Sequence, residues 1–95
     1  MIERLKTIEE RYNEINRELT NPEIVSDIKK TTALSKEQAN LQEAYEAYQE
    51  YKKLASDIEE AKELIKDPEL GEFAKEELSS LEEKKSDLEK QIEIL

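Results

Sequence analysis

Apolar residues recur every three or four positions along most of the chain, and this spacing constrains the fold more than any other feature of the sequence. Near the N-terminus the repeating positions are Ile2, Leu5, Ile8, Tyr12, Ile15 and Leu19. An α-helix turns once in about 3.6 residues, so side chains at this spacing form one apolar stripe with the charged residues opposite. The spacing therefore predicts a first helix of about five turns that packs on one side.

Two similar tripeptides, Asn21 to Glu23 and Asp67 to Glu69, interrupt the apolar pattern. An Asn or Asp side chain can accept hydrogen bonds from the first amides of a helix, proline fits the first helical position, and glutamate is favoured in the first turn. Each tripeptide therefore predicts the start of a helix. We expect the first to open a short helix or helical connector over Pro22 to Leu34, and the second to open the last helix.

A heptad repeat begins at Leu41 and predicts a long helix that runs to about Lys66. One core position holds Leu41, Tyr48 and Ala55, the other holds Ala44, Tyr51, Ile58 and Ile65, and the stripe is widened by Tyr45, Leu54 and Ala61. A stripe of this width suggests contact with two neighbouring helices. Upstream, Ser35 to Gln38 has the spacing of a capping box, so a helix either starts at Ser35 or passes through it as part of a bent continuous helix.

The last predicted helix completes an all-α fold. Its apolar stripe is Leu70, Phe73, Ala74, Leu78, Leu81, Leu88, Ile92 and Leu95. Lys85 stands where the pattern expects an apolar residue, and Gly71 lies in the first turn. We expect one domain over residues 1–95, an antiparallel bundle of three main helices plus a short extra helix, in which the second and third main helices form a coiled-coil-like hairpin.

The composition excludes most catalytic and metal chemistry. The chain has no cysteine and no histidine, so it can build neither a thiolate zinc site nor a nucleophile paired with histidine. Its one glycine cannot make a phosphate-binding loop. No apolar run exceeds two residues, which is too few for a membrane span or a signal-peptide core. We therefore expect no catalytic residue, no cofactor, no metal ligand and no membrane partner, in a cytoplasmic protein.

Acidic pairs and a tyrosine series are the remaining candidates for a site. The pairs are Glu59-Glu60, Glu76-Glu77 and Glu82-Glu83. Neighbours on a helix point about 100° apart, so these pairs indicate solvated faces more than acid/base or metal sites. Tyr45, Tyr48 and Tyr51 could stack bases or bind a partner, but tyrosine at core spacing usually packs with its hydroxyl toward solvent. We expect Tyr48 and Tyr51 in the core and Tyr45 to be the exposed aromatic.

The charge argues against direct binding of duplex nucleic acid. The chain has 25 acidic and 15 basic residues, a net charge of −10. The densest basic spots are Lys29-Lys30, Lys52-Lys53 and Lys84-Lys85. Binding to phosphates needs a basic field, whereas the residues from Asp67 onward carry ten acidic and four basic groups. Any contact with RNA is therefore local or depends on another domain for attraction, and a basic protein is the alternative partner.

Five segments occur in a distinctive order along the chain. They are Asn21 to Asp27, Leu34 to Ala39, Tyr48 to Tyr51, Asp67 to Leu70 and Ala74 to Leu78. Together they resemble the N-terminal domain of the bacterial class I peptide chain release factors, and the resemblance covers essentially all 95 residues. It implies a helical domain of a factor that acts in translation termination at UAA and UAG stop codons. The family's Pro-x-Thr and Gly-Gly-Gln motifs belong to its codon-reading and catalytic domains and do not occur here, so we expect a fragment that is not an enzyme by itself.

The resemblance also implies partners. In the family this domain lies near the stalk base of the large ribosomal subunit and influences recycling by the class II release factor, and the methyltransferase of the catalytic glutamine is a further candidate partner. We expect a positioning and interaction module whose exposed ends, Asn21 to Asp27 and Lys66 to Leu70, are the first places to look for contacts. Two alternatives stay open: a stand-alone coiled-coil scaffold or adaptor, and a nucleic-acid-binding helical arm, which the charge disfavours.

Overall fold

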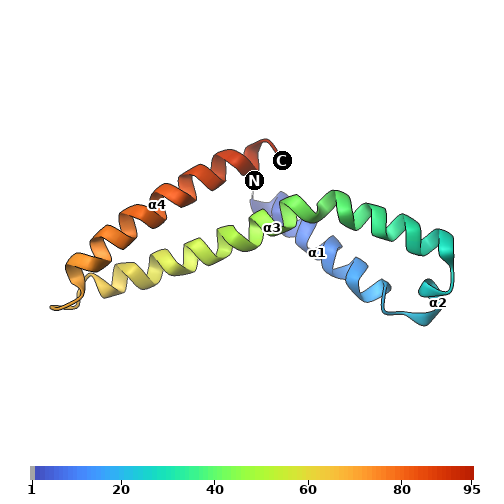
Figure 1. The fold of residues 1–95 in the computed structure, drawn as a ribbon, viewed down its shortest axis with the longest axis horizontal. Coiled ribbons are helices and arrows are strands. Elements are labelled where there is room, and N and C mark those ends of the chain that lie inside the picture. Colours follow the sequence, from blue (N-terminus) through green and yellow to red (C-terminus); the bar gives the residue numbers. More distant parts are fainter. Residues whose placement is uncertain (1) are drawn as a thin grey trace. The chain divides into compact units, whose positions relative to one another are not determined.

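The computed structural model describes residues 2–95 and is all-α in that range, as predicted. Its helices are α1 (Ile2–Glu18), α2 (Pro22–Val25), α3 (Ile28–Leu64) and α4 (Gly71–Glu93) (Figure 1). The three main helices, the short extra helix and the long helical hairpin are therefore confirmed. The chain forms two compact units that divide between Tyr48 and Gln49, and α3 contributes to both.

In the first unit, α1 runs antiparallel to the first half of α3 (Figure 1). Near the end of α1, the Gln38 side-chain amide donates a hydrogen bond of 2.6 Å to the Asn16 side-chain oxygen. Four residues earlier in α1, the Tyr12 ring stacks on Tyr45 with centroids 3.9 Å apart and planes 12° apart. The predicted stripe of α1 faces inward, because its six apolar members are all buried or half-buried.

The connection between α1 and α3 differs from the prediction of one segment from Pro22 to Leu34. Asn21 caps α2 as expected, since its Oδ1 accepts a 3.0 Å hydrogen bond from the Glu23 amide. However, α2 ends at Val25, and the Asp27 carboxylate accepts a 3.2 Å hydrogen bond from the Lys30 amide at the start of α3. A second cap therefore starts the long helix at Ile28. The capping-box spacing at Ser35 falls inside that continuous helix.

In the second unit, α4 runs antiparallel to the second half of α3 (Figure 1). The core-facing side of α3 buries Leu54, Ile58 and Ala61. On α4 the inward positions follow a strict three–four alternation, namely Gly71, Ala74, Leu78, Leu81, Lys85, Leu88 and Ile92. All seven are buried or half-buried. This regular repeat is the geometry of an antiparallel coiled-coil hairpin.

The register of α4 corrects the predicted stripe at two positions. Leu70 and Phe73 each precede an inward position by one residue, so they are turned about 100° away from the core. Leu70 is 48% exposed and Phe73 is 61% exposed. The small residues Gly71 and Ala74 occupy the inward positions instead.

Lys85, which breaks the apolar stripe in the sequence, has a partner in the structure. Its Nζ lies over the ring of Tyr51, 5.6 Å from the centroid. An ammonium group at this distance is attracted to the negative face of an aromatic ring. The side chain therefore occupies an inward position of α4 without leaving its charge unpartnered.

Candidate interaction surface

The connection between α3 and α4 forms an open, mostly acidic groove of about 830 Å³. Its lining residues are Glu59, Glu60, Glu63, Leu64, Lys66 and Asp67. Together with the exposed Leu70 and Phe73, these residues make up what we call the turn surface. It includes most of the Lys66 to Leu70 segment that the sequence singled out as an exposed end.

Asp67 organises the backbone of the turn surface. Its Oδ1 accepts hydrogen bonds from the amides of Glu69 at 2.8 Å and Leu70 at 3.0 Å, and its carbonyl accepts one of 2.9 Å from the Gly71 amide. The predicted hydrogen bonds from the following amides to the Asp67 side chain are therefore present. The prediction that the helix starts at Pro68 was wrong, because α4 begins at Gly71 with Leu70 at its N-cap. Hydrogen bonds from two backbone amides hold the pKa of the Asp67 carboxyl below its usual range, and the Leu70 amide has a larger effect than the Glu69 amide. The carboxylate therefore stays ionised near neutral pH.

The charge around this connection is strongly negative. Residues 59 to 77 include eight carboxylates and three lysines, a formal charge of −5. Each lysine forms an exposed ion pair with a glutamate on its own helix or turn: Lys62 with Glu59, Lys66 with Glu63 and Lys75 with Glu72. These pairs lie three residues apart and neutralise only part of the acidic field.

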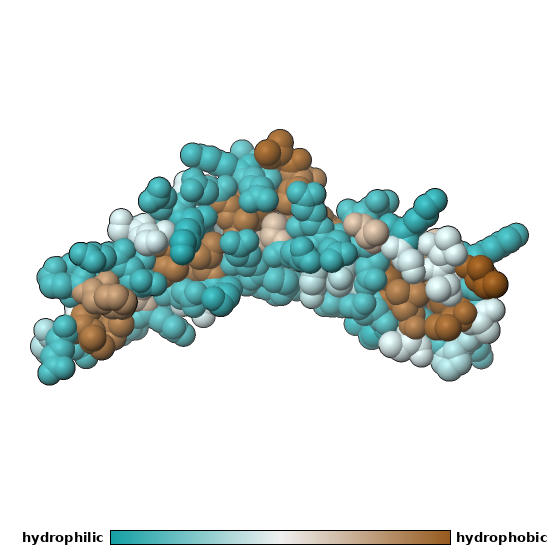
Figure 2. All heavy atoms as spheres, in the orientation of Figure 1, coloured by the Kyte–Doolittle hydropathy of each residue, from teal (hydrophilic) through white to brown (hydrophobic). Residues whose placement is uncertain are grey.

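Exposed apolar side chains also occur at the connection between α3 and α4. Figure 2 shows apolar atoms gathered at the connection between α3 and α4, at the left of the view. Leu70 and Phe73 are the large apolar residues exposed there. An apolar centre with a polar rim is the usual anatomy of a protein–protein interface.

The other predicted end also exposes apolar side chains, with different charges around them. Val25 on α2 is 50% exposed and Ile28 at the start of α3 is 80% exposed. Figure 2 shows apolar atoms at this end of the first unit as well. Lys29 and Lys30 follow directly and are exposed. We call Val25, Ile28, Lys29 and Lys30 the α2 surface.

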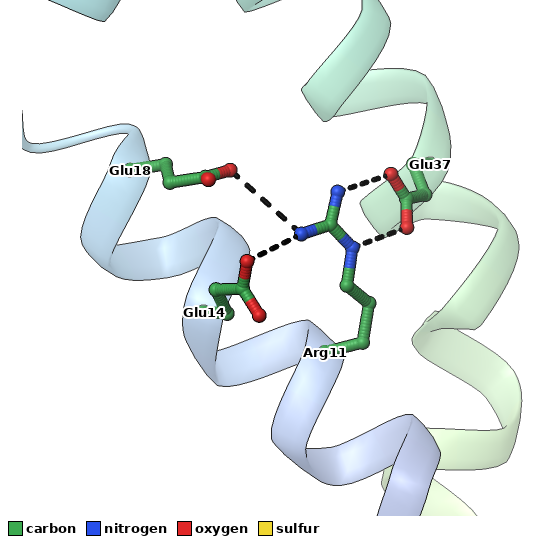
Figure 3. Close-up of polar contacts among 4 residues, drawn as sticks. All are labelled: Arg11, Glu14, Glu18 and Glu37. Carbon is green, nitrogen blue, oxygen red and sulfur yellow. Dashed lines mark hydrogen bonds and ion pairs between the residues drawn. The ribbon is translucent and has the colours of Figure 1, made fainter.

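Sequence reasoning missed an ion-pair cluster centred on Arg11 (Figure 3). Its guanidinium donates two hydrogen bonds to Glu37, from Nε at 2.5 Å and from Nη2 at 2.7 Å. Nη1 also lies 2.9 Å from Glu14 and 3.9 Å from Glu18. The hydrogen bond from Arg11 lowers the pKa of Glu37, and the same bond raises the pKa of Arg11.

The Arg11 cluster joins α1 to α3 and has the character of a structural contact. A guanidinium that already holds a carboxylate through two parallel bonds has little capacity left for an external anion. Arg11 and Glu37 are 26 residues apart in the chain. The spacing of Arg11 and Glu14 along one helix is the part of the cluster that the sequence could have predicted. The pairing of Arg11 with Glu37 depends on how two helices pack, so spacing along the chain does not predict it.

The tyrosines do not form an exposed aromatic platform. Tyr48 is buried and Tyr51 is half-buried beneath Lys85, as the core interpretation predicted. The expectation that Tyr45 is exposed was wrong, because its ring is half-buried and stacks on Tyr12.

The acidic and basic pairs do not converge into a site either. The members of the acidic pairs 59–60, 76–77 and 82–83 are all exposed. Within residues 2–95, no group of three or more acidic side chains is placed to hold a metal ion. Lys53 forms an ion pair of 3.6 Å with Asp57, and Lys85 lies over Tyr51. No helix in the described range has the length and apolarity needed to cross a membrane.

Comparison with known proteins gives a consistent match. The PCRF domain family matches residues 8–95. Peptide chain release factor 1 of a Nitratiruptor species is 53% identical over 93 residues, which are 98% of this chain and 26% of that protein. The factors of the same name from Helicobacter pylori and a Geobacillus species are 50% and 42% identical, each over 100% of this chain and 27% of their own length. The chain thus spans about a quarter of the length of these relatives, and no solved structure matches it.

Proposed function

The chain belongs to the PCRF domain family, and on that basis we propose that it is the N-terminal domain of a peptide chain release factor that ends translation at UAA and UAG codons. One observation carries the proposal. Over essentially the whole chain, 50–53% of the residues are identical to those of relatives named peptide chain release factor 1. The alternative of a stand-alone coiled-coil scaffold accounts for the heptads but not for this identity. A cytoplasmic location follows from the proposed role.

Within such a factor, the chain is an interaction module with no bond-making of its own. Its one glycine leaves no Gly-Gly-Gln loop to promote hydrolysis of peptidyl-tRNA. We place it near the stalk base of the large ribosomal subunit, in contact with a protein component. Its net charge of −10 supports a basic protein over RNA as the direct neighbour. The class II release factor and the glutamine methyltransferase of release factors are further proposed partners.

A chimaera tests this function. The first quarter of the Nitratiruptor factor is replaced by this chain, and peptide release is measured on ribosomes programmed with UAA, UAG or a sense codon. We expect codon-dependent release at a rate similar to that of the parent factor, and none from the 95-residue chain alone. The control is the parent factor with its first quarter deleted. A folded chimaera that neither binds nor releases better than this deletion control would contradict the proposal.

A further inference from the structure

We propose that the turn surface is a docking site for a basic protein segment that inserts an apolar side chain against Leu70 and Phe73. The inference rests on the proposed function, since it identifies which surface of the interaction module makes a contact and what chemistry the partner has. Its two elements are the exposed apolar pair and the acidic groove, which are linked by the hydrogen bond from the Leu70 amide to Asp67.

Phe73 is the clearest sign of an interface on this chain. The other aromatic residues are the four tyrosines, and each of them is buried or half-buried. Phe73 is 61% exposed because the heptad register turns it away from α3, and Leu70 lies three residues earlier in the chain. Exposed apolar residues that are close together often mark binding sites, and aromatic side chains are enriched among the residues that dominate binding energy.

The charge beside the apolar pair selects a basic partner. Residues 59 to 77 carry a formal charge of −5, and Asp67 is held in its ionised form by two backbone amides. This field repels the phosphates of RNA and the acidic groups of a second copy docking through the same surface. A lysine- or arginine-rich protein segment is attracted to it, and charge complementarity raises the rate of encounter.

The turn surface is also preorganised. Asp67 lines the groove, and it fixes the turn by accepting hydrogen bonds from the amides of Glu69 and Leu70. The acidic groove and the apolar pair are therefore joined through one hydrogen-bonded turn. A surface that is already ordered loses less conformational entropy when a partner binds.

The α2 surface provides a matched control. It exposes the aliphatic residues Val25 and Ile28 to a similar or greater extent. The charges beside them are balanced, with Glu23 and Asp27 against Lys29 and Lys30. The groove next to them is lined by Arg11 and Lys30 as well as by Glu18 and Glu37. A basic probe that is merely attracted to any exposed apolar residue would respond to changes at both surfaces. A probe that docks as proposed responds only at the turn surface.

The test measures binding of the 95-residue chain to a synthetic helical peptide of lysine, arginine and leucine, by calorimetry. We expect Phe73→Ala to weaken binding by about tenfold or more, as for an interface residue that dominates binding energy, and Val25→Ala to leave it unchanged. The double substitution Glu60→Gln with Glu63→Gln should weaken binding and reduce its salt dependence. Its control, Glu43→Gln with Glu46→Gln, changes two exposed glutamates on the first half of α3 and should have little effect.

Circular dichroism of each variant confirms folding, which exposed positions should not disturb. A peptide in which glutamate replaces every basic residue, and a single-stranded RNA, serve as further probes. Three results would each overturn the inference. Phe73→Ala and Val25→Ala could weaken peptide binding equally, neither substitution could change it, or the RNA could bind more tightly than the basic peptide. Release by the chimaera is a separate readout, so a working chimaera with a peptide affinity insensitive to Phe73→Ala overturns only this inference.

Discussion

Gly71 on α4 approaches the carbonyl oxygen of Ile65 so closely that a Cβ added to the glycine would lie 2.6 Å from that oxygen. The obstacle is backbone, so it cannot move aside as a flexible side chain would. Gly71 therefore permits the close approach of the two ends of the turn, and its small size is required by packing. It has a negative φ, so a special backbone conformation is not the reason for glycine here.

Gly71→Ala is expected to destabilise the chain by about 1–3 kcal/mol, the usual cost of overpacking. A loss of stability would identify the steric conflict at Gly71, because replacing glycine by alanine in an exposed helix normally stabilises a protein by about 1 kcal/mol. Urea denaturation followed by circular dichroism measures the change. Ser80→Ala, at an exposed position of α4, is the control and should be neutral or slightly stabilising. A stabilised Gly71→Ala variant would show that the turn has room for the methyl group.

Leu81→Ala is expected to lower the free energy of unfolding by about 2–5 kcal/mol, because Leu81 is buried at an inward position of α4. Phe73→Ala, on the same helix but exposed, should change stability by no more than about 0.5 kcal/mol. Both values come from urea denaturation under the same conditions. Similar losses for the two variants would mean that the register of α4 is not the one described.

Glu37→Gln is expected to remove part of the acid sensitivity of folding. The hydrogen bond from Arg11 lowers the pKa of Glu37 below its ordinary value of 4.5, so the ionised form stabilises the folded state. That contribution is present above the unfolded-state pKa and is lost as the pH falls below 4.5 through the folded-state value. Wild type should exceed the variant in stability at neutral pH, and the difference should shrink in acid.

Glu43→Gln is the control for the pH experiment, since Glu43 is exposed and no ion pair within residues 2–95 includes it. Its stability difference from wild type should change little over the same pH range. Urea denaturation at a series of pH values measures both variants. If the stability difference between wild type and Glu37→Gln grew as the pH fell, the ionised form of Glu37 would not be the one that stabilises the folded state.

Asp67→Ala is expected to destabilise the turn between α3 and α4, because the amides of Glu69 and Leu70 lose their acceptor. Asp67→Asn keeps an oxygen acceptor and should restore most of the stability. Amide hydrogen exchange at Glu69 and Leu70 reports the effect directly. Faster exchange in the alanine variant than in the asparagine variant is the expected result, and equal exchange in all three proteins would rule out the cap.

Much of the fold follows from local patterns in the sequence. The stripe from Ile2 to Leu19 and the Asn–Pro start depend on spacing and capping chemistry within a few residues, and these predictions were confirmed. At the Asp–Pro start the Asp67 hydrogen bonds are present, but α4 begins at Gly71. The start of α3 was missed because two adjacent caps, Asn21 and Asp27, compete within one short segment.

The errors in the candidate sites have a common physical cause, namely the packing of one helix on another. Phe73 and Ala74 are adjacent apolar residues, and the packing of α4 on α3 places Ala74 inward and leaves Phe73 exposed. In the same way, Tyr45 becomes half-buried through the ring of Tyr12, and Arg11 reaches Glu37 across two helices. Spacing along one helix does not specify such partners.

Lys85 makes one alignment of α3 and α4 more favourable than the others, which a uniformly apolar seam would not do. The lysine meets an aromatic face only where it stands opposite Tyr51. If α4 slid by one heptad along α3, the ammonium group would meet Ala44 or Ile58, neither of which can partner its charge. The one interruption in the apolar stripe therefore specifies which of several similar alignments the two helices adopt.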